Sequence, residues 1–305
     1  MQKDFGSVRA LRGLDLEIGR GEIWGLIGPG GAGKTTTLRL LAGLFPPTGG
    51  EALVLGARLT PSGTNDFERV RHRIGYMPQG LCCYRDLTVS ENLYFFGRIY
   101  GIGPRKMKER IEFLLEFTGL VPFARRLADH LSGGMRQKLG LACSILPDPD
   151  ILLLDEPTNG IDPAARQDFW DLLRTLRQEQ EPAVLIATCY MDEAARCDRV
   201  TLLYEGRALA AGPPAALAEL LEGKVLEVKG VQIYRAREVL ASLPGVKEAN
   251  LFGDHLHLVV QDQIQEEEVK GALAGAGLHG AEVCRIPPCC EDIFLSLLER
   301  QGGLQ

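Results

Sequence analysis

The sequence lacks a long hydrophobic run. A membrane-spanning helix requires roughly 18 consecutive apolar residues, and the most apolar stretch, 200–221, is interrupted by charged residues and prolines. The first ten residues, MQKDFGSVRA, contain an acidic residue and no apolar block, so they do not have the pattern of a secretory signal. We therefore expect a cytoplasmic chain that reaches a membrane only where another chain holds it.

Cysteine and positive charge are also scarce. Eight cysteines in 305 residues are too few for a disulfide-stapled domain, and no CxxC pair is present. We expect reduced thiols, with a metal or redox role as the alternative. The formal net charge of -6 argues against a broad basic face for duplex DNA or RNA, so no nucleic-acid partner is expected.

The length of 305 residues predicts two domains. Short apolar runs at 23–30, 151–157 and 183–188 are typical of parallel strands buried on both faces, and they alternate with helical patterns at 35–45 and 164–180. We predict an α/β domain over 1–222. Within it, residues of about 80–135 place apolar side chains three and four apart, which indicates a mainly helical insert.

The pattern changes over 223–305 to strand, helix, two strands around a Gly-Asp turn, helix, strand and a last helix. This βαββαβ order predicts a small ferredoxin-like α+β domain. The segment holds 8 Lys and Arg against 12 Asp and Glu, so its net charge is negative and nucleic acid is again disfavoured.

A glycine-rich segment, GPGGAGKT at 28–35, follows the first buried strand and precedes a helix. Its spacing fits GxxxxGK[ST], in which glycines let backbone N–H groups face a phosphate and the helix presents its positive end. Lys34 would supply charge to the outer phosphates, Thr35 a hydroxyl to magnesium and Thr36 a further phosphate contact. The alternative is a glycine-rich structural turn. The predicted nucleotide contacts are Gly28, Gly30, Gly31, Ala32, Gly33, Lys34, Thr35 and Thr36.

Two adjacent carboxylates, Asp155 and Glu156, follow the apolar run at 151–154. They therefore lie at the carboxyl edge of a buried strand, where α/β proteins bind ligands. Asp155 is suited to holding magnesium through water, and Glu156 to orienting or deprotonating an attacking water. The alternative is a carboxylate pair that caps the next helix.

The segment LSGGMRQK at 131–138 resembles the signature LSGGxxQ/R of ATP-binding cassette (ABC) proteins. The order of motifs also resembles that family: the phosphate loop at 28–36, Gln79 in GYMPQ, ILLLDEP at 151–157 and Asp162 in NGIDP. P-loop kinases and GTPases lack this signature. The resemblance implies a P-loop ABC ATPase core that binds ATP and magnesium.

The resemblance also implies that two such domains face head to tail around two ATP molecules. The phosphate loop of one domain would then face the signature of the other, including Ser132, Gly133, Gly134 and Gln137, with Asp162 close by. A serine hydroxyl and N–H groups at a helix start form an anion cradle. ATP would hold the protomers together, so dimerisation would be part of the mechanism.

Two further residues carry roles by resemblance. Phe5 is similar to the family's aromatic residue that stacks on adenine, with an ordinary apolar edge residue as the alternative. The chain starts a few residues before Phe5, where family members carry a first strand, so we expect either a start farther upstream or a missing edge strand. Gln79 would contact magnesium and the attacking water at the hinge to the helical insert.

Residues 80–100 would, by resemblance, receive the coupling helix of a multi-span membrane permease. Packing within the domain core is an equally good explanation for several of these side chains. The candidate apolar contacts are Cys82, Cys83, Tyr84, Leu87 and Tyr94.

The sequence departs from the family at one catalytic position. In TCYMDEA at 188–194, Cys189 stands where family members carry a histidine that bonds the γ-phosphate. A thiol is a weak donor with an ordinary pKa of about 8.5. Loss of one transition-state donor typically costs on the order of 10² to 10³ in rate. We expect slow hydrolysis at this site and a partner ATPase subunit with an intact histidine; an ordinary homodimer is the alternative.

Three functions follow from these motifs. The first is an ATP-hydrolysing subunit that energises an exporter from the cytoplasmic face of the inner membrane, because CCYRDLTVSEN and PPCCEDIFLSLL resemble stand-alone ATPases of multidrug or antibiotic efflux. The second is a nucleotide-gated regulatory subunit of an asymmetric heterodimer. The third is a soluble ABC ATPase of DNA repair or translation, although those usually carry two cassettes or large inserts.

Overall fold

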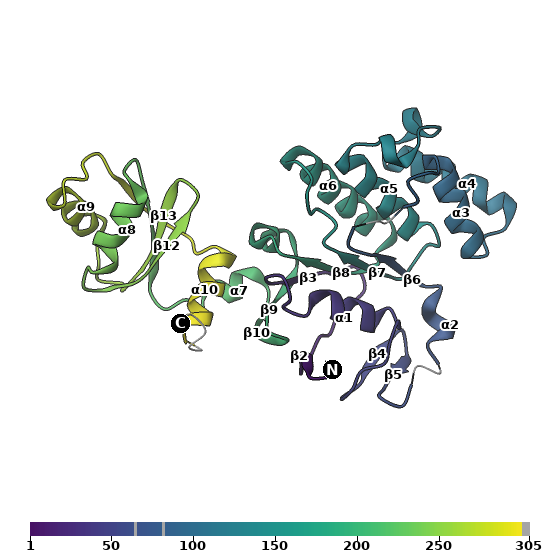
Figure 1. Cartoon of the computed structure of the whole chain (residues 1–305), viewed down its shortest axis with the longest axis horizontal. Helices are drawn as coiled ribbons and strands as arrows, with labels where there is room; N and C mark the ends of the chain where they lie inside the picture. The colour runs from purple at the N-terminus through teal and green to yellow at the C-terminus, as the bar shows by residue number, and fades with distance from the viewer. Residues whose placement is uncertain (64–65, 81–82, 301–305) are drawn as a thin grey trace. The chain divides into compact units, whose positions relative to one another are not determined.

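A computed structural model describes residues 1–63, 66–80 and 83–300 (Figure 1). The chain divides into two compact units, 1–208 and 209–305. The division falls before the boundary at 222/223 that the sequence suggests, because α7 (Pro214–Ala218) packs against α10 (Cys290–Arg300). In the described ranges, no helix has both the length and the apolar character needed to span a bilayer.

A six-stranded sheet organises the first unit, and its edge strand β10 (Arg207–Gly212) continues past the division at 208/209. Its order is β10-β9-β3-β8-β7-β6, and the neighbours from β9 to β6 run parallel. The central strands are buried nearly throughout, as short apolar runs covered on both faces should be. The strands are β3 (Ile23–Ile27), β6 (Ile74–Met77), β7 (Ile151–Asp155), β8 (Ala183–Thr188), β9 (Arg199–Tyr204) and β10 (Arg207–Gly212).

Helices cover both faces of this sheet. Figure 1 shows α1 (Lys34–Leu41) on one side and α5 (Gly133–Ile145) with α6 (Pro163–Gln180) on the other. α1 is shorter than the helical pattern at 35–45. Gly43 ends it with a φ of 69°, and a Cβ there would lie 2.3 Å from the Phe67 ring.

Smaller elements complete the first unit. β1 (Gln2–Phe5) pairs antiparallel with β2 (Val8–Arg12), so the expectation of a missing edge strand is wrong. Lys3 on β1 is buried and donates to the Pro46 carbonyl, which fixes the strand to the core. A second hairpin joins β4 (Ala52–Val54) to β5 (Ala57–Leu59), followed by α2 (Glu68–Arg71).

The segment between β6 and β7 is mainly helical. It contains α3 (Val89–Ile99), α4 (Pro104–Phe117), two short 3-10 turns and α5. α3 begins with a capping box, in which Thr88 accepts from the Glu91 N–H and the Glu91 side chain accepts from the Thr88 N–H. A further 3-10 helix, Met191–Arg196, follows β8.

The second unit has a four-stranded antiparallel sheet of order β12-β13-β11-β14. α8 and α9 pack on one face, where Leu240 of α8 and Leu273 of α9 join Leu226 and Leu258 of the sheet in one core cluster. The other face carries the alternate side chains, which include His257, and α10 approaches it. The elements are β11 (Lys224–Lys229), α8 (Ile233–Ala241), β12 (Val246–Phe252), β13 (His255–Val260), α9 (Glu266–Gly275) and β14 (Glu282–Ile286).

Candidate functional site

The phosphate loop connects β3 to α1 and requires glycine at two positions. A Cβ at Gly28 would lie 2.0 Å from the Leu203 carbonyl oxygen, and one at Gly33 would lie 2.7 Å from the Ala10 carbonyl oxygen. Gly33 also has a φ of 109°, where other residues are strained. The two glycines therefore let the loop pack tightly against the backbone at Leu203 and Ala10. The N–H groups of the loop then lie at the start of α1, where an anion can bind.

Lys34 is the central charge of this loop. Its side chain is 5% exposed, and its ammonium donates to the carbonyls of Gly28 at 2.7 Å and Pro29 at 3.1 Å. It also pairs with Glu156 Oε1 at 3.0 Å, and that carboxylate is 7% exposed. A buried cation therefore lies where the phosphate loop meets the carboxylate that the sequence predicts to activate water.

Glu156 is held in a strained position. Its φ of 51° lies in the left-handed region, which costs a non-glycine residue on the order of 1 kcal/mol. Its N–H donates to the Ala187 carbonyl at 2.9 Å, and its Oε2 accepts from the Cys189 N–H at 3.1 Å. The backbone of Glu156 is thus held by Ala187, and its carboxylate is held by Cys189 and Lys34.

Thr35 and Asp155 bring two oxygen ligands together. Thr35 Oγ1 donates to Asp155 Oδ1 at 2.9 Å, and Tyr76 Oη lies 3.5 Å from Asp155 Oδ2. Burial raises the pKa of Asp155, and the hydrogen bond from Thr35 opposes that shift. Hydroxyl and carboxylate oxygens are the ligands that Mg²⁺ prefers, so this pair fits a magnesium ion beside the phosphates.

A pocket of about 360 Å³ opens over the loop. Gln79, Lys34 and Glu156 line it together, as the sequence predicts for a nucleotide site. Arg9, Arg12 and Glu205 also line it, and sequence reasoning missed them because they belong to no motif. The full lining is Val8, Arg9, Ala10, Arg12, Gly30, Gly31, Ala32, Gly33, Lys34, Thr35, Thr36, Gln79, Glu156 and Glu205.

Phe5 does not line this pocket. It lies at the end of β1 with 47% of its surface exposed, and its ring meets Phe45 edge-on at 5.4 Å between centroids. The Lys3 ammonium lies 5.1 Å from the ring centroid of Phe5. The adenine-stacking role therefore stays a prediction from resemblance.

The signature segment lies at the start of α5. Ser132 is the exposed N-cap, and its Oγ accepts from the Met135 N–H at 3.2 Å. A Cβ at Gly134 would lie 2.5 Å from the Ala165 side chain of α6, so glycine permits the close approach of these helices.

Asp162 caps α6 by accepting from the Ala165 N–H at 2.9 Å. The pocket over the phosphate loop is lined by none of Ser132, Gly133, Gly134, Gln137 and Asp162.

Cys189 lies beside the Glu156 carboxylate. Burial and the neighbouring Glu156 raise the pKa of the Cys189 thiol. The thiol therefore stays neutral at pH 7 and does not supply the positive charge that an imidazolium would.

The expected coupling surface is only partly exposed. Tyr84 is 49% and Tyr94 is 54% exposed, whereas Cys83 is 8% exposed and belongs to the core, so its assignment as a surface contact is wrong. Cys82 lies outside the described residues. Tyr94 borders an apolar groove of about 520 Å³ on the helical segment, lined by Leu87, Ser90, Glu91, Tyr94, Phe95, Arg98 and Ile111.

Comparisons with known proteins agree with this geometry. The family model described as ABC transporter matches residues 11–159. The Nod factor export ATP-binding protein I of Rhizobium sp. (strain N33) is 38% identical over 304 residues, which are 99% of this chain and 96% of that protein. The chain belongs to the ATP-binding proteins of the ABC transporter family.

Other relatives extend the comparison. A probable multidrug ABC transporter ATP-binding protein, YbhF of Escherichia coli (strain K12), is 43% identical over 214 residues, and the chain spans only 36% of its length. An ATP-binding subunit of an ABC transporter has a TM-score of 0.63 at 27% identity, covering 72% of this chain and 89% of that one. The ATP-binding cassette MJ0796, in a dimeric post-hydrolysis state with ADP and Pi, has a TM-score of 0.62 at 26% identity. That comparison covers 70% of this chain and 94% of that one. This ABC ATPase core thus corresponds to about the first two thirds of the chain.

Proposed function

We propose that this chain hydrolyses ATP to energise an exporter, by closing on a second ATPase subunit and driving a multi-span permease. The observation that carries the proposal is the buried pair of Lys34 and Glu156 in the pocket over the phosphate loop. A cation suited to the phosphates and a carboxylate suited to the attacking water thus share one buried site, 3.0 Å apart, where a bound phosphate would lie beside both. The relatives named for export support the direction of transport.

Each residue has a role in this proposal. Lys34 and the loop N–H groups would bind the phosphates, and Glu156 would accept a proton from the attacking water. Thr35 and Asp155 would hold magnesium, which supplies charge neutralisation for the phosphates when bound, and Gln79 would orient the water from the rim. Replacement of the Lys34 contact to Glu156 by a phosphate oxygen would free that carboxylate to act.

The second half of the site would come from another protomer. At the start of α5, Ser132 is exposed and Gly133 is half-buried, whereas Gly134 is buried against α6. None of the three lines the pocket over the phosphate loop, so the Ser132 hydroxyl and the Gly133 N–H are available to a partner's nucleotide. The dimeric state of the similar cassette MJ0796 supports this arrangement. ATP would then link the two subunits.

The thiol of Cys189 is compatible with two kinds of dimer, which differ in how much ATP this chain hydrolyses. A neutral thiol beside Glu156 favours a weakened site here and a partner subunit that carries the histidine. The alternative is a regulatory subunit that clamps on ATP with little hydrolysis of its own. We expect no nucleic-acid partner in either form.

Two further assignments complete the proposal. The apolar groove around Tyr94 would receive a permease helix, which would hold the chain at the cytoplasmic face of the membrane. The βαββαβ order and the β12-β13-β11-β14 sheet support a ferredoxin-like fold for the second unit.

The test is ATP turnover by purified Glu156→Gln, with Glu109→Gln as a matched control on the exposed surface of α4. We expect turnover to fall on the order of 10²-fold or more in the first variant and to stay unchanged in the second. Turnover by Glu156→Gln equal to that of the parent chain would reject hydrolysis at this site and support the regulatory alternative.

A further inference from the structure

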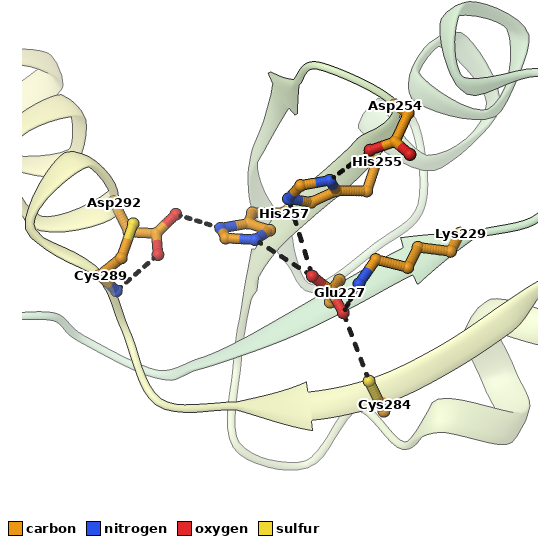
Figure 2. Close-up of polar contacts among 8 residues, drawn as sticks. All are labelled: Glu227, Lys229, Asp254, His255, His257, Cys284, Cys289 and Asp292. Atoms are coloured by element: carbon orange, nitrogen blue, oxygen red, sulfur yellow. Dashed lines mark hydrogen bonds and ion pairs between the residues drawn. The ribbon is translucent and has the colours of Figure 1, made fainter. Parts of the chain in front are cut away.

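The second unit carries a group of titratable side chains that the nucleotide chemistry does not use. Glu227 on β11 pairs across the sheet with His257 on β13, and His255 lies two residues earlier on the same face. Figure 2 shows both imidazole rings directed toward the Glu227 carboxylate. One ligand atom from each of these three residues lies within 4.8 Å of the others. We call Glu227, His255 and His257 the histidine–glutamate cluster.

Each histidine of the cluster is oriented by a carboxylate behind it. His257 Nδ1 lies 2.9 Å from Asp292 Oδ1, and His255 Nδ1 lies 2.9 Å from Asp254 Oδ1 (Figure 2). An ionised carboxylate only accepts hydrogen bonds, so Nδ1 is the donor and the neutral ring has its lone pair on Nε2. Carboxylates behind metal-binding histidines fix the tautomer and the ring orientation in the same way.

The two Nε2 atoms face one carboxylate oxygen. Glu227 Oε2 lies 3.7 Å from His255 Nε2 and 3.8 Å from His257 Nε2. These distances exceed an N–H···O hydrogen bond of roughly 2.7–3.2 Å. They are close to the separation of roughly 3.3 Å between ligand atoms around a tetrahedral zinc ion. A small contraction of these two contacts would therefore give the spacing between the carboxylate oxygen and each nitrogen that a shared metal ion requires.

Burial and charge also favour a cation at this point. His257 is 7% and Glu227 14% exposed, Asp292 is fully buried, and Phe252 stacks on the His257 ring at 4.1 Å between centroids. The three carboxylates carry formal charge -3, and Lys229, which donates to Glu227 Oε1 at 2.7 Å, contributes +1. A divalent ion would bring the local charge to zero.

The neighbouring cysteines do not belong to the ligand set. Cys284 Sγ lies 3.8 Å from Glu227 Oε1, the oxygen that faces away from the histidines. Cys289 lies near His257 and Asp292, but the His257 nitrogen on that side, Nδ1, is already bonded to Asp292, and the second oxygen of Asp292 accepts from the Cys289 N–H. These contacts leave Glu227 Oε2 and the two histidine Nε2 atoms as the atoms that could together coordinate a metal ion.

We propose that Glu227 Oε2, His255 Nε2 and His257 Nε2 bind a divalent transition-metal ion such as Zn²⁺, for which two histidines, one carboxylate and a water are a known ligand set. The fourth position is left to water. The ion would join β11 to β13 and, through the Asp292 contact, connect this face of the sheet to α10. The site is independent of the proposed ATP hydrolysis.

The test uses the full chain, stripped with a chelator and free of nucleotide and magnesium, with Zn²⁺ alone as the probe. We expect one Zn²⁺ bound per chain through this cluster, and an affinity at least tenfold weaker in His255→Gln and in Glu227→Gln, measured by competition with a chromophoric chelator. The matched controls are His279→Gln, an exposed histidine of the same unit, and Glu238→Gln on α8. Cys284→Ser should keep the parent affinity within about twofold.

Folding of each variant is checked by its unfolding temperature in chelator. Zn²⁺ should raise this temperature in the parent chain and in the controls but not in Glu227→Gln. Absence of Zn²⁺ binding by the parent chain, or equal affinity of the cluster variants and the controls, would overturn the proposal. A tenfold loss in Cys284→Ser would overturn the three-residue ligand set.

Discussion

The phosphate-loop site and the histidine–glutamate cluster obtain their charged groups in different ways. Lys34 and Thr35 are adjacent in one short motif, and strand order then brings Asp155 and Glu156 to them. Glu227 and His257, by contrast, meet only because β11 and β13 pair in one register. A motif can be read from the sequence, whereas a site made by register appears only once the strands are paired.

The strongest test of this contrast removes the cation of the motif-based site. In Lys34→Ala, the phosphates lose their buried ammonium and Glu156 loses its partner, so ATP turnover should fall on the order of 10²-fold or more. Zn²⁺ affinity should be unchanged, because the cluster shares no residue with the loop. Lys108→Ala on α4 is the matched control, and a similar loss of turnover there would show that the effect is not local.

The next largest effect is expected at Cys189. Cys189→His would place a stronger donor beside Glu156 and should raise turnover of the isolated chain tenfold or more. The check is steady-state phosphate release at equal protein concentration, with Cys284→His as the control substitution. Equal turnover by the parent chain and Cys189→His, with both dimerising on ATP, would contradict a weakened site.

A smaller effect is expected on the Zn²⁺ affinity of the histidine–glutamate cluster. Lys229→Gln removes the ammonium that competes for the Glu227 carboxylate, so Zn²⁺ should bind roughly threefold to tenfold more tightly. Lys270→Gln on α9 leaves the cluster untouched and serves as the control. Weaker Zn²⁺ binding by Lys229→Gln would mean that Lys229 supports the cluster rather than competing for it.

The smallest expected effect concerns stability. Asp162→Ala removes the cap of α6 and should lower the free energy of unfolding by about 1 kcal/mol, measured by denaturant titration without nucleotide. Asp168→Ala, on the exposed side of the same helix, should cost less because it removes only a surface ion pair. An equal loss of unfolding free energy in Asp162→Ala and Asp168→Ala would argue against the capping role of Asp162.

The sequence predicted the main elements of the ATPase core because their signals are local. The apolar runs became β3, β7 and β8, and the loop before Lys34 joined a strand to a helix. Arg9 and Arg12 at the pocket rim were missed, since they belong to a hairpin that has no motif. The Glu156 backbone strain and the burial of Cys83 depend on packing between distant segments, which no spacing rule encodes.

In the proposed mechanism, the nucleotide is shared between the phosphate loop of one protomer and Ser132 of another. The most direct test of this sharing is the molar mass of Glu156→Gln in solution with and without ATP, compared with the same protein carrying Ser132→Arg. We expect a dimer that forms only with ATP, and we expect Ser132→Arg to abolish this dimer while each monomer still binds ATP. A protein that stays monomeric when saturated with ATP would contradict the shared site. So would a dimer that still forms in Ser132→Arg.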